Sequence, residues 1–321
     1  MKNNSTTKKV IIAIVGLAAI LLPVFSSDPY ILHIAIAILI WSMLALGIRI
    51  VLVSGHLNIA QASFMGFGAY ASGALAMKLG WSFWICLPLA GVIAAILAII
   101  VGLPTLRIKG AYFVIITLGL SEVSRRIWMM WDSLFGGPQG LLGIPPPDAI
   151  KLGGLAIMFN SKVHYFYLAF VLFVITVFVM WRFEKSRTGL LLKSFPKADM
   201  LAESSGVYIM KYKVAAFALG AFFAGLAGSF WAHYFTYCSP WDFTLMASFY
   251  MLMYVVMGGT GSIAGPIVGS AVMLTLDELL RPFKEYMPMI LGVILILVLR
   301  FMPGGIISIP GLIRDAVMRK E

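Results

Sequence analysis

The residue types best suited to recognising another molecule lie together in residues 199–206, which read Asp199-Met200-Leu201-Ala202-Glu203-Ser204-Ser205-Gly206. A short helix that ends at Gly206 can stop sharply, because glycine tolerates left-handed backbone angles. Ala202 is small enough to let a partner surface approach, and Glu203 can pair with a basic residue across the contact. This amphipathic, glycine-terminated segment indicates a docking site for a soluble protein. A solvated helix without a partner is the alternative.

A second candidate lies inside a hydrophobic stretch, where Glu122 is followed three and four residues later by Arg125 and Arg126. Ionisable residues within membrane spans are rare and usually functional. The spacing puts the three side chains on one helical face, where they can neutralise one another. They could bind a zwitterionic substrate, but a self-satisfied ion pair at a helix end is the favoured interpretation. The sequence lacks the chain of buried acids that a proton- or sodium-driven carrier needs.

Other potentially reactive residues form no catalytic or metal-binding pattern. The four histidines are scattered and the sequence contains no H-E-x-x-H, G-x-S-x-G or Walker lysine motif. They are His33, His56, His164 and His233. Cys86 and Cys238 belong to no C-x-x-C or metal-ligand spacing, so both are interpreted as packing residues. The sequence therefore predicts no catalytic residue, no metal site and no cofactor bound by this chain.

The composition places these candidates in a membrane. Of 321 residues, 61% are hydrophobic and only 12% are charged, whereas a soluble domain has about 25% charged residues. The formal charge of +11 is explained by lysine and arginine gathering in cytoplasmic loops near anionic lipid, so it does not indicate nucleic acid. We expect an all-α polytopic membrane protein.

Each membrane-spanning helix needs about 20 apolar residues, and breaks divide the chain into about ten such segments. These are residues 9–26, 30–53, 59–79, 83–103, 110–131, 164–182, 213–235, 242–258, 264–280 and 286–301. The first also resembles a secretory signal peptide, but it lacks a clear small-x-small cleavage site, which favours an uncleaved span.

The basic residues predict the orientation. Residues 182–213 hold seven Lys and Arg against three acids, so this segment is expected in the cytoplasm together with both termini. Arg125, Arg126, Arg281 and Lys284 lie near predicted outer ends and weigh against this orientation. Residues 1–321 then form a single transmembrane domain. It is divided into a first half (9–182), a cytoplasmic segment (183–212), a second half (213–305) and a cytoplasmic tail (306–321).

The longest predicted outer loop spans residues 132–163. It contains the glycine-rich residues 136–140 and three consecutive prolines at 145–147, which exclude a continuous helix. A loop of this length can meet an external partner or cover a pathway, and a simple spacer is an equal alternative.

Two glycine-rich polar stretches, residues 55–70 and 258–272, interrupt the apolar spans. Placing Gly55 on Gly259 aligns residues 59–60 with 263–264, which indicates the weak internal two-fold repeat found in transporters. Unwound backbone at membrane depth must be buried in protein or line an aqueous cavity. Half-helix breaks are predicted at Gly55, Gly66, Gly259, Gly261 and Gly265.

The small residues of these stretches could instead allow tight helix packing, which is the favoured interpretation for the glycines. Asn58, Gln61 and Ser63 would suit the start of a half-helix that faces a cavity. For Asn58 and Gln61, lining a substrate pathway and capping the helix are equally good interpretations.

Several stretches in order resemble one known family. They are residues 55–70, residues 106–113 with 117–122, residues 136–140, and residues 186–189 leading to 199–206; residues 216–228 and 258–269 extend the match. Together they resemble the permease subunits of branched-chain amino-acid ABC importers, in the LivM-like branch of the branched-chain amino acid and urea permease family. The resemblance covers residues from about 40 to 305.

The resemblance implies a permease subunit for leucine, isoleucine, valine or related small polar solutes in a bacterial inner membrane. Sister branches handle urea, short amides and other amino acids. The implied partners are a sister permease, two cytoplasmic ATPases that bind ATP and magnesium, and an external solute-binding protein.

By position, Asp199, Ala202, Glu203 and Gly206 match the family segment that couples the permease to the ATPase. Ser204 and Ser205 depart from the small or apolar residues usual there. An ion-coupled secondary carrier or channel is the alternative function.

Overall fold

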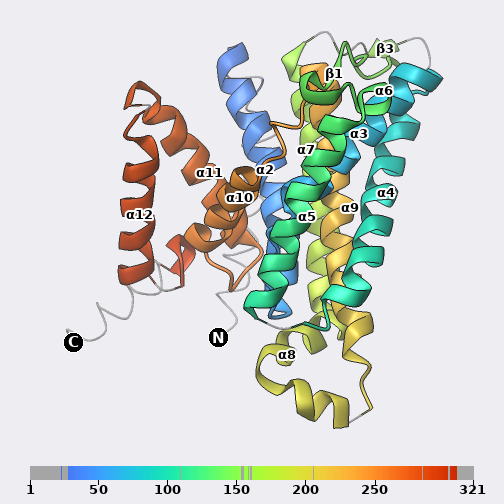
Figure 1. Cartoon of the computed structure of the whole chain (residues 1–321). Helices are drawn as coiled ribbons and strands as arrows, with labels where there is room; N and C mark the ends of the chain where they lie inside the picture. The colour runs from blue at the N-terminus through green and yellow to red at the C-terminus, as the bar shows by residue number, and fades with distance from the viewer. Residues whose placement is uncertain are drawn as a thin grey trace.

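The computed structural model describes residues 23, 28–108, 110–152, 155–157, 159, 161–204, 206–283, 285–302 and 304–308. Apart from Pro23, the predicted span at residues 9–26 lies outside these residues, as does the tail after residue 308. The described chain is overwhelmingly helical (Figure 1).

Within the described residues, each predicted span from residue 30 onward contains one helix. The helices are α2 (Pro29–Val53), α3 (Gln61–Leu79), α4 (Phe83–Thr105), α5 (Ala111–Met130), α7 (Lys162–Lys185), α9 (Ile209–Phe235), α10 (Leu245–Gly258), α11 (Ala264–Leu279) and α12 (Met287–Phe301). Five helices there are long and apolar enough to cross a membrane: α2, α4, α7, α9 and the stretch Met289–Ser308. The all-α membrane architecture is confirmed, while the count of ten spans stays a prediction.

Local sequence explains several helix ends. Asp28 caps α2 by accepting a 2.8 Å hydrogen bond from the Tyr30 amide, and Pro29 follows at the first helical position. Thr244 caps α10 in the same way, so α10 begins at Leu245. Gly80 ends α3 with φ of 63°, a left-handed conformation that glycine adopts without strain.

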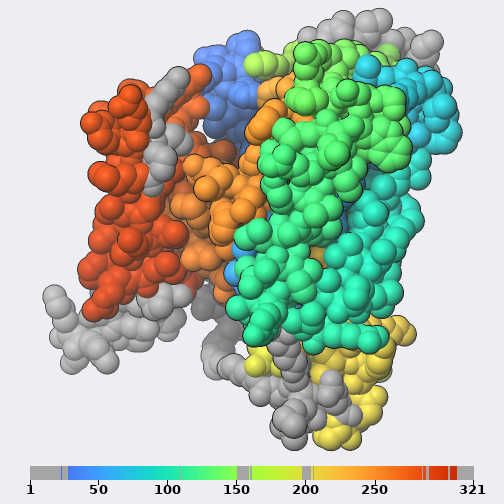
Figure 2. Space-filling model, in the orientation of Figure 1, coloured from blue at the N-terminus to red at the C-terminus, as the bar shows by residue number. Residues whose placement is uncertain are grey.

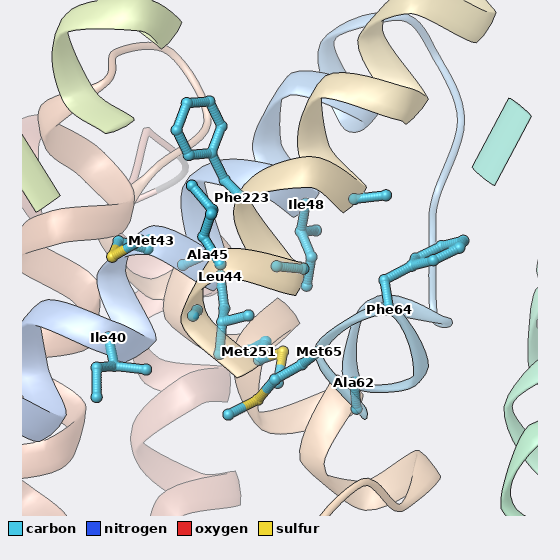
Figure 3. Packing of buried hydrophobic residues seen from close by; sticks show 14 of the residues in the cluster. Ile40, Met43, Leu44, Ala45, Ile48, Ala62, Phe64, Met65, Phe223 and Met251 are labelled. Atoms are coloured by element: carbon cyan, nitrogen blue, oxygen red, sulfur yellow. The ribbon is translucent and has the colours of Figure 1, made fainter. Parts of the chain in front are cut away.

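Helix α9 occupies the centre of the bundle and packs against α2, α3 and α4. Close helix contact depends on glycine: a Cβ at Gly68 would collide with the backbone of Gly225, and one at Gly228 would collide with the carbonyl of Met65. Figure 3 shows side chains from α2, α3, α9 and α10 meeting in this core, among them Ile48, Phe64 and Phe223. Helices α11 and α12 lie at one side, beside α10 (Figure 1).

The two ends of the bundle differ. Helix α8 (Arg187–Ser204) projects beyond one end, and the loop from residue 132 to 163 covers the other (Figure 1). That loop holds α6 (Asp132–Phe135), η1 (Gly137–Gln139), β1 (Leu141–Leu142), β2 (Ile150–Leu152) and β3 (Leu155–Ile157). β2 pairs antiparallel with β3, and β1 pairs antiparallel with β4 (Tyr237–Cys238). Two short helical turns, η2 (Arg281–Phe283) and η3 (Ile306–Ser308), flank α12.

Asp148 fixes this loop to the bundle. Its Oδ2 accepts hydrogen bonds from the Ser82 hydroxyl at 2.6 Å and the Phe83 amide at 3.0 Å, at the first residues of α4. It thus caps a helix that begins 65 residues earlier in the chain. The loop is therefore folded onto the helices, which the sequence alone did not predict.

Candidate functional site

The first interruption separates α2 from α3 at residues 54–60, and buried side chains satisfy its backbone. Gly55 has φ of +86°. The Asn58 Oδ1 accepts from the Ala60 amide at 2.9 Å, and the Asn58 Nδ2 donates to Gln61 Oε1 at 3.1 Å. The Gln61 Nε2 donates in turn to the Gly220 carbonyl at 3.2 Å. Both side chains are at most 1% exposed, so in this conformation they bind protein groups.

Two neighbouring helices also bind this segment. Ser121 of α5 donates to the Ile59 carbonyl at 3.2 Å, and Ser248 of α10 accepts from the Ala62 amide at 3.0 Å. Ser63 is fully buried, and its hydroxyl has no hydrogen-bond partner among the described residues. The interruption is therefore fixed by α5 and α10 as well as by α9.

The second interruption, at residues 259–263, separates α10 from α11. Gly259 has φ of +102°. A Cβ at Gly259 would collide with the Gly304 carbonyl oxygen, and a Cβ at Gly305 would collide with the backbone of Gly259. Gly258 likewise lies against the backbone of Gly265. Both interruptions thus contain a positive-φ glycine five or six residues before the next helix starts. The two-fold repeat itself stays a prediction.

Two of the glycines predicted as breaks lie inside helices, and a third lies within the second interruption. Gly66 lies within the continuous helix α3, where a Cβ would collide with the Trp128 ring, so it permits packing and does not interrupt the helix. Gly265 lies in the first turn of α11. Gly261 lies in the connecting turn, with open space where a Cβ would be.

A polar face on α5 carries the ion pairs expected from the sequence. Glu122 pairs with Arg125 at 2.5 Å and with Arg126 at 3.0 Å. The side chains of Glu122 and Arg126 remain 45% and 65% exposed. They border a shallow hollow with Met130 and Trp131. Figure 2 shows α5, in green, at the molecular surface along its length.

Helix α8 contains the predicted docking segment. It follows α7 after a one-residue break at Ser186, and Gly189 packs directly against the backbone of Glu184. The helix ends at Ser204, and Gly206 has φ of +78°, as the glycine-terminated pattern predicts. Asp199, Ala202 and Glu203 lie in the last turns of α8, and their side chains are outside the described part of the structure.

Sequence reasoning missed two charged residues in this region. Arg49 is 4% exposed within the apolar helix α2, and its guanidinium binds the carboxylate of Glu184 at 2.9 and 3.0 Å. A charge inside an apolar span is a functional signal by itself, so Arg49 was detectable. The pairing with Glu184 was not detectable, because Glu184 lies in a segment whose sequence is typical of a solvated loop.

The predicted packing cysteines are both buried free thiols. Burial raises the pKa of Cys238 to about 12, which keeps its thiol neutral beside β1. In the described part of the chain, no group of three or more His, Cys, Asp or Glu residues is arranged to hold a metal ion.

Known proteins resemble the chain over most of its length. The family model described as "Branched-chain amino acid transport system / permease component" matches residues 30–299. The proteins called "High-affinity branched-chain amino acid transport system permease protein LivM" in Salmonella typhimurium and Escherichia coli are each 32% identical over 293 residues. Those residues are 85% of this chain and 69% of each relative.

A more distant relative is the "Autoinducer 2 import system permease protein LsrC" of an Enterobacter species. It is 23% identical over 321 residues, which cover 97% of this chain and 87% of the relative. No solved structure is significantly similar to the chain.

Proposed function

The chain belongs to the family of branched-chain amino acid transport permease components, and from this we propose that it moves leucine, isoleucine and valine across a bacterial inner membrane. It is a permease subunit of an ATP-driven importer and not an enzyme. The observation that carries this function is the 32% identity to LivM over 85% of the chain.

ABC permeases work with ATPase and solute-binding partners. For this chain we propose two cytoplasmic ATPases, one sister permease and one external solute-binding protein. ATP and magnesium bind to the ATPases, and the permease itself needs no cofactor. Its basic residues contact anionic lipid and no nucleic acid.

The end of α8 is proposed to dock on an ATPase through Asp199, Ala202, Glu203 and Gly206. Support comes from its position, because α8 projects from one end of the bundle (Figure 1). It also ends at a positive-φ glycine, so the last turn stops sharply at the surface.

The exposed face of α5 is proposed to line the pathway between this chain and the sister permease. Charged groups on a membrane helix are costly against lipid, so Glu122 and Arg126 require a water-filled or protein-covered environment. The hollow beside them also has apolar walls from Met130 and Trp131. A branched-chain amino acid has the matching chemistry, namely a zwitterionic end and an apolar side chain.

Asn58, Gln61 and Ser63 are proposed to belong to the same pathway by shaping the interrupted segment behind α5. Ser121 joins that segment to α5 directly. A change in the hydrogen bonds of Asn58 or Gln61 would therefore change the position of the pathway wall.

Purification of the tagged chain from its host in a mild detergent tests the assembly, and uptake by proteoliposomes tests the function. We expect two ATPases and a second permease to co-purify, and radiolabelled leucine to enter only with ATP and the binding protein. Isoleucine and valine should compete, and urea and short amides should not. Uptake by the chain alone, driven by an ion gradient without ATP, would establish a secondary carrier instead.

A further inference from the structure

Arg49 uses every nitrogen of its guanidinium to join separate parts of the molecule. Its Nη1 and Nη2 donate to the two carboxylate oxygens of Glu184, at 2.9 and 3.0 Å. Its Nε donates to the Thr260 carbonyl at 2.9 Å. The planar, forked group fits this arrangement in a way that a lysine ammonium does not.

Glu184 extends the contact to α8. Its Oε1 also pairs with Lys193 of α8 at 2.6 Å. The Arg49 and Glu184 side chains are 5% and 15% exposed, so solvent screens this pair weakly. One carboxylate at the end of α7 therefore joins α2 and α8.

The other side of Arg49 holds the second interruption. Thr260 directly follows Gly259, whose positive φ and contact with Gly305 define the turn between α10 and α11. A hydrogen bond from a buried guanidinium to the Thr260 carbonyl fixes this turn relative to α2 and α7.

Helix α8 reaches the first interruption as well. A Cβ placed at Gly55 would lie 3.4 Å from the Cγ of Pro196, so this α8 residue packs over the turn between α2 and α3. A displacement of α8 would therefore act on both interrupted segments. Pro196 would transmit it to the turn between α2 and α3. Lys193, Glu184 and Arg49 would transmit it to the turn between α10 and α11.

We propose that Arg49 and Glu184, with Lys193, form the link through which α8 sets the position of the turn between α10 and α11 during transport. Arg49 is a positioning residue that acts without touching the substrate. The inference rests on the proposed function, since it requires an ATPase to move α8.

The test compares Arg49→Lys with Arg182→Lys in the complete complex. Arg182 is exposed in the last turn of α7, outside the link, and so is a matched control. In proteoliposomes, the ratio of leucine transported to ATP hydrolysed should fall at least tenfold in Arg49→Lys and stay at the wild-type value in Arg182→Lys. An unchanged ratio in Arg49→Lys overturns the proposal.

A conformational readout separates this role from a merely structural one. Gly261→Cys introduces a thiol into the turn where a Cβ has open space, and both native cysteines are buried. Its maleimide labelling rate should differ between the nucleotide-free and vanadate-trapped complexes. Arg49→Lys should remove this difference; an equal difference in both backgrounds contradicts the link.

A second variant keeps the test available if the complex with Arg49→Lys does not assemble. Lys193→Met removes the α8 end of the link at a side chain that is 45% exposed, and it should also remove the labelling difference. If the wild-type complex does not transport leucine, the proposed function fails, whereas the labelling experiment still decides on the link.

Discussion

At the scale of single residues, buried polar groups hold the interrupted segments in place. Asn58 binds the Ala60 amide just before α3, Gln61 binds the Gly220 carbonyl within α9, and Arg49 binds the Thr260 carbonyl in the turn between α10 and α11. A buried hydrogen-bonding group that loses its partner costs about 1–3 kcal/mol. These positions should therefore be sensitive even where a substitution changes little volume.

Asn58→Leu tests this sensitivity. The substitution leaves the Ala60 amide and the side-chain oxygen of Gln61 without their partner. It should lower the free energy of unfolding by about 2–6 kcal/mol, from two unsatisfied groups. Thermal unfolding of the purified chain in detergent measures the loss. Thr275→Ala, which removes an exposed hydroxyl bonded within α11, is the control and should have little effect.

Glycines at helix contacts give a second residue-scale prediction. Gly68→Ala places a methyl group against the Gly225 backbone, and separating α3 from α9 should cost about 1–3 kcal/mol. Gly119→Ala, inside α5 and with nothing near its Cβ, should instead stabilise the helix by about 0.5–1 kcal/mol. We expect the melting temperature to fall in Gly68→Ala and to rise in Gly119→Ala. An equal shift in both variants would show that helix propensity alone determines the effect of the substitution.

At the scale of helices and loops, apolar length made the positions of α2 to α5, α7 and α9 to α12 predictable, because each crossing needs about 20 apolar residues. Local pattern also predicted the end of α8 at Gly206 and the ion pairs of Glu122. It could not predict the pairing of Arg49 with Glu184, since that depends on how α2 and α7 pack against each other.

The side-chain contacts of the candidate site likewise depend on how the helices pack, so the sequence could not predict them. A polar run within an apolar sequence indicates an interruption, but it does not say whether Asn58 faces a cavity or the backbone. Gly66 shows the converse problem, because a helix-packing glycine and a helix-breaking glycine look alike in sequence. The antiparallel contact of β1 with β4 joins residues about 95 positions apart, beyond any local signal.

The prediction at this scale concerns α8. Glu203→Lys reverses the charge proposed to meet a basic residue of the ATPase, so ATP-dependent uptake should be abolished while membrane insertion stays normal. Uptake assays and membrane fractionation measure the two effects. Glu285→Lys, an exposed charge reversal before α12, should retain uptake, and normal uptake by Glu203→Lys would remove the docking role from α8.

At the scale of the whole molecule, two exposed helical faces must have different surroundings. Between its charged ends, the exposed residues of α7 are apolar, including Val171, Val174 and Phe178, and suit lipid. The exposed face of α5 mixes apolar residues with Glu122 and Arg126. Lipid is a poor environment for that mixture, so the sister permease and the pathway should cover α5.

Val123→Trp and Val171→Trp test this assignment as a matched pair, because the two valines are 55% and 52% exposed on their helices. A bulky ring at position 123 should obstruct the interface or the pathway, and we expect a loss of leucine uptake of at least tenfold, or loss of the co-purifying permease. A ring at position 171 has only lipid to displace and should be tolerated. Equal tolerance at both positions would place α5 against lipid, and its charged residues would then need another explanation.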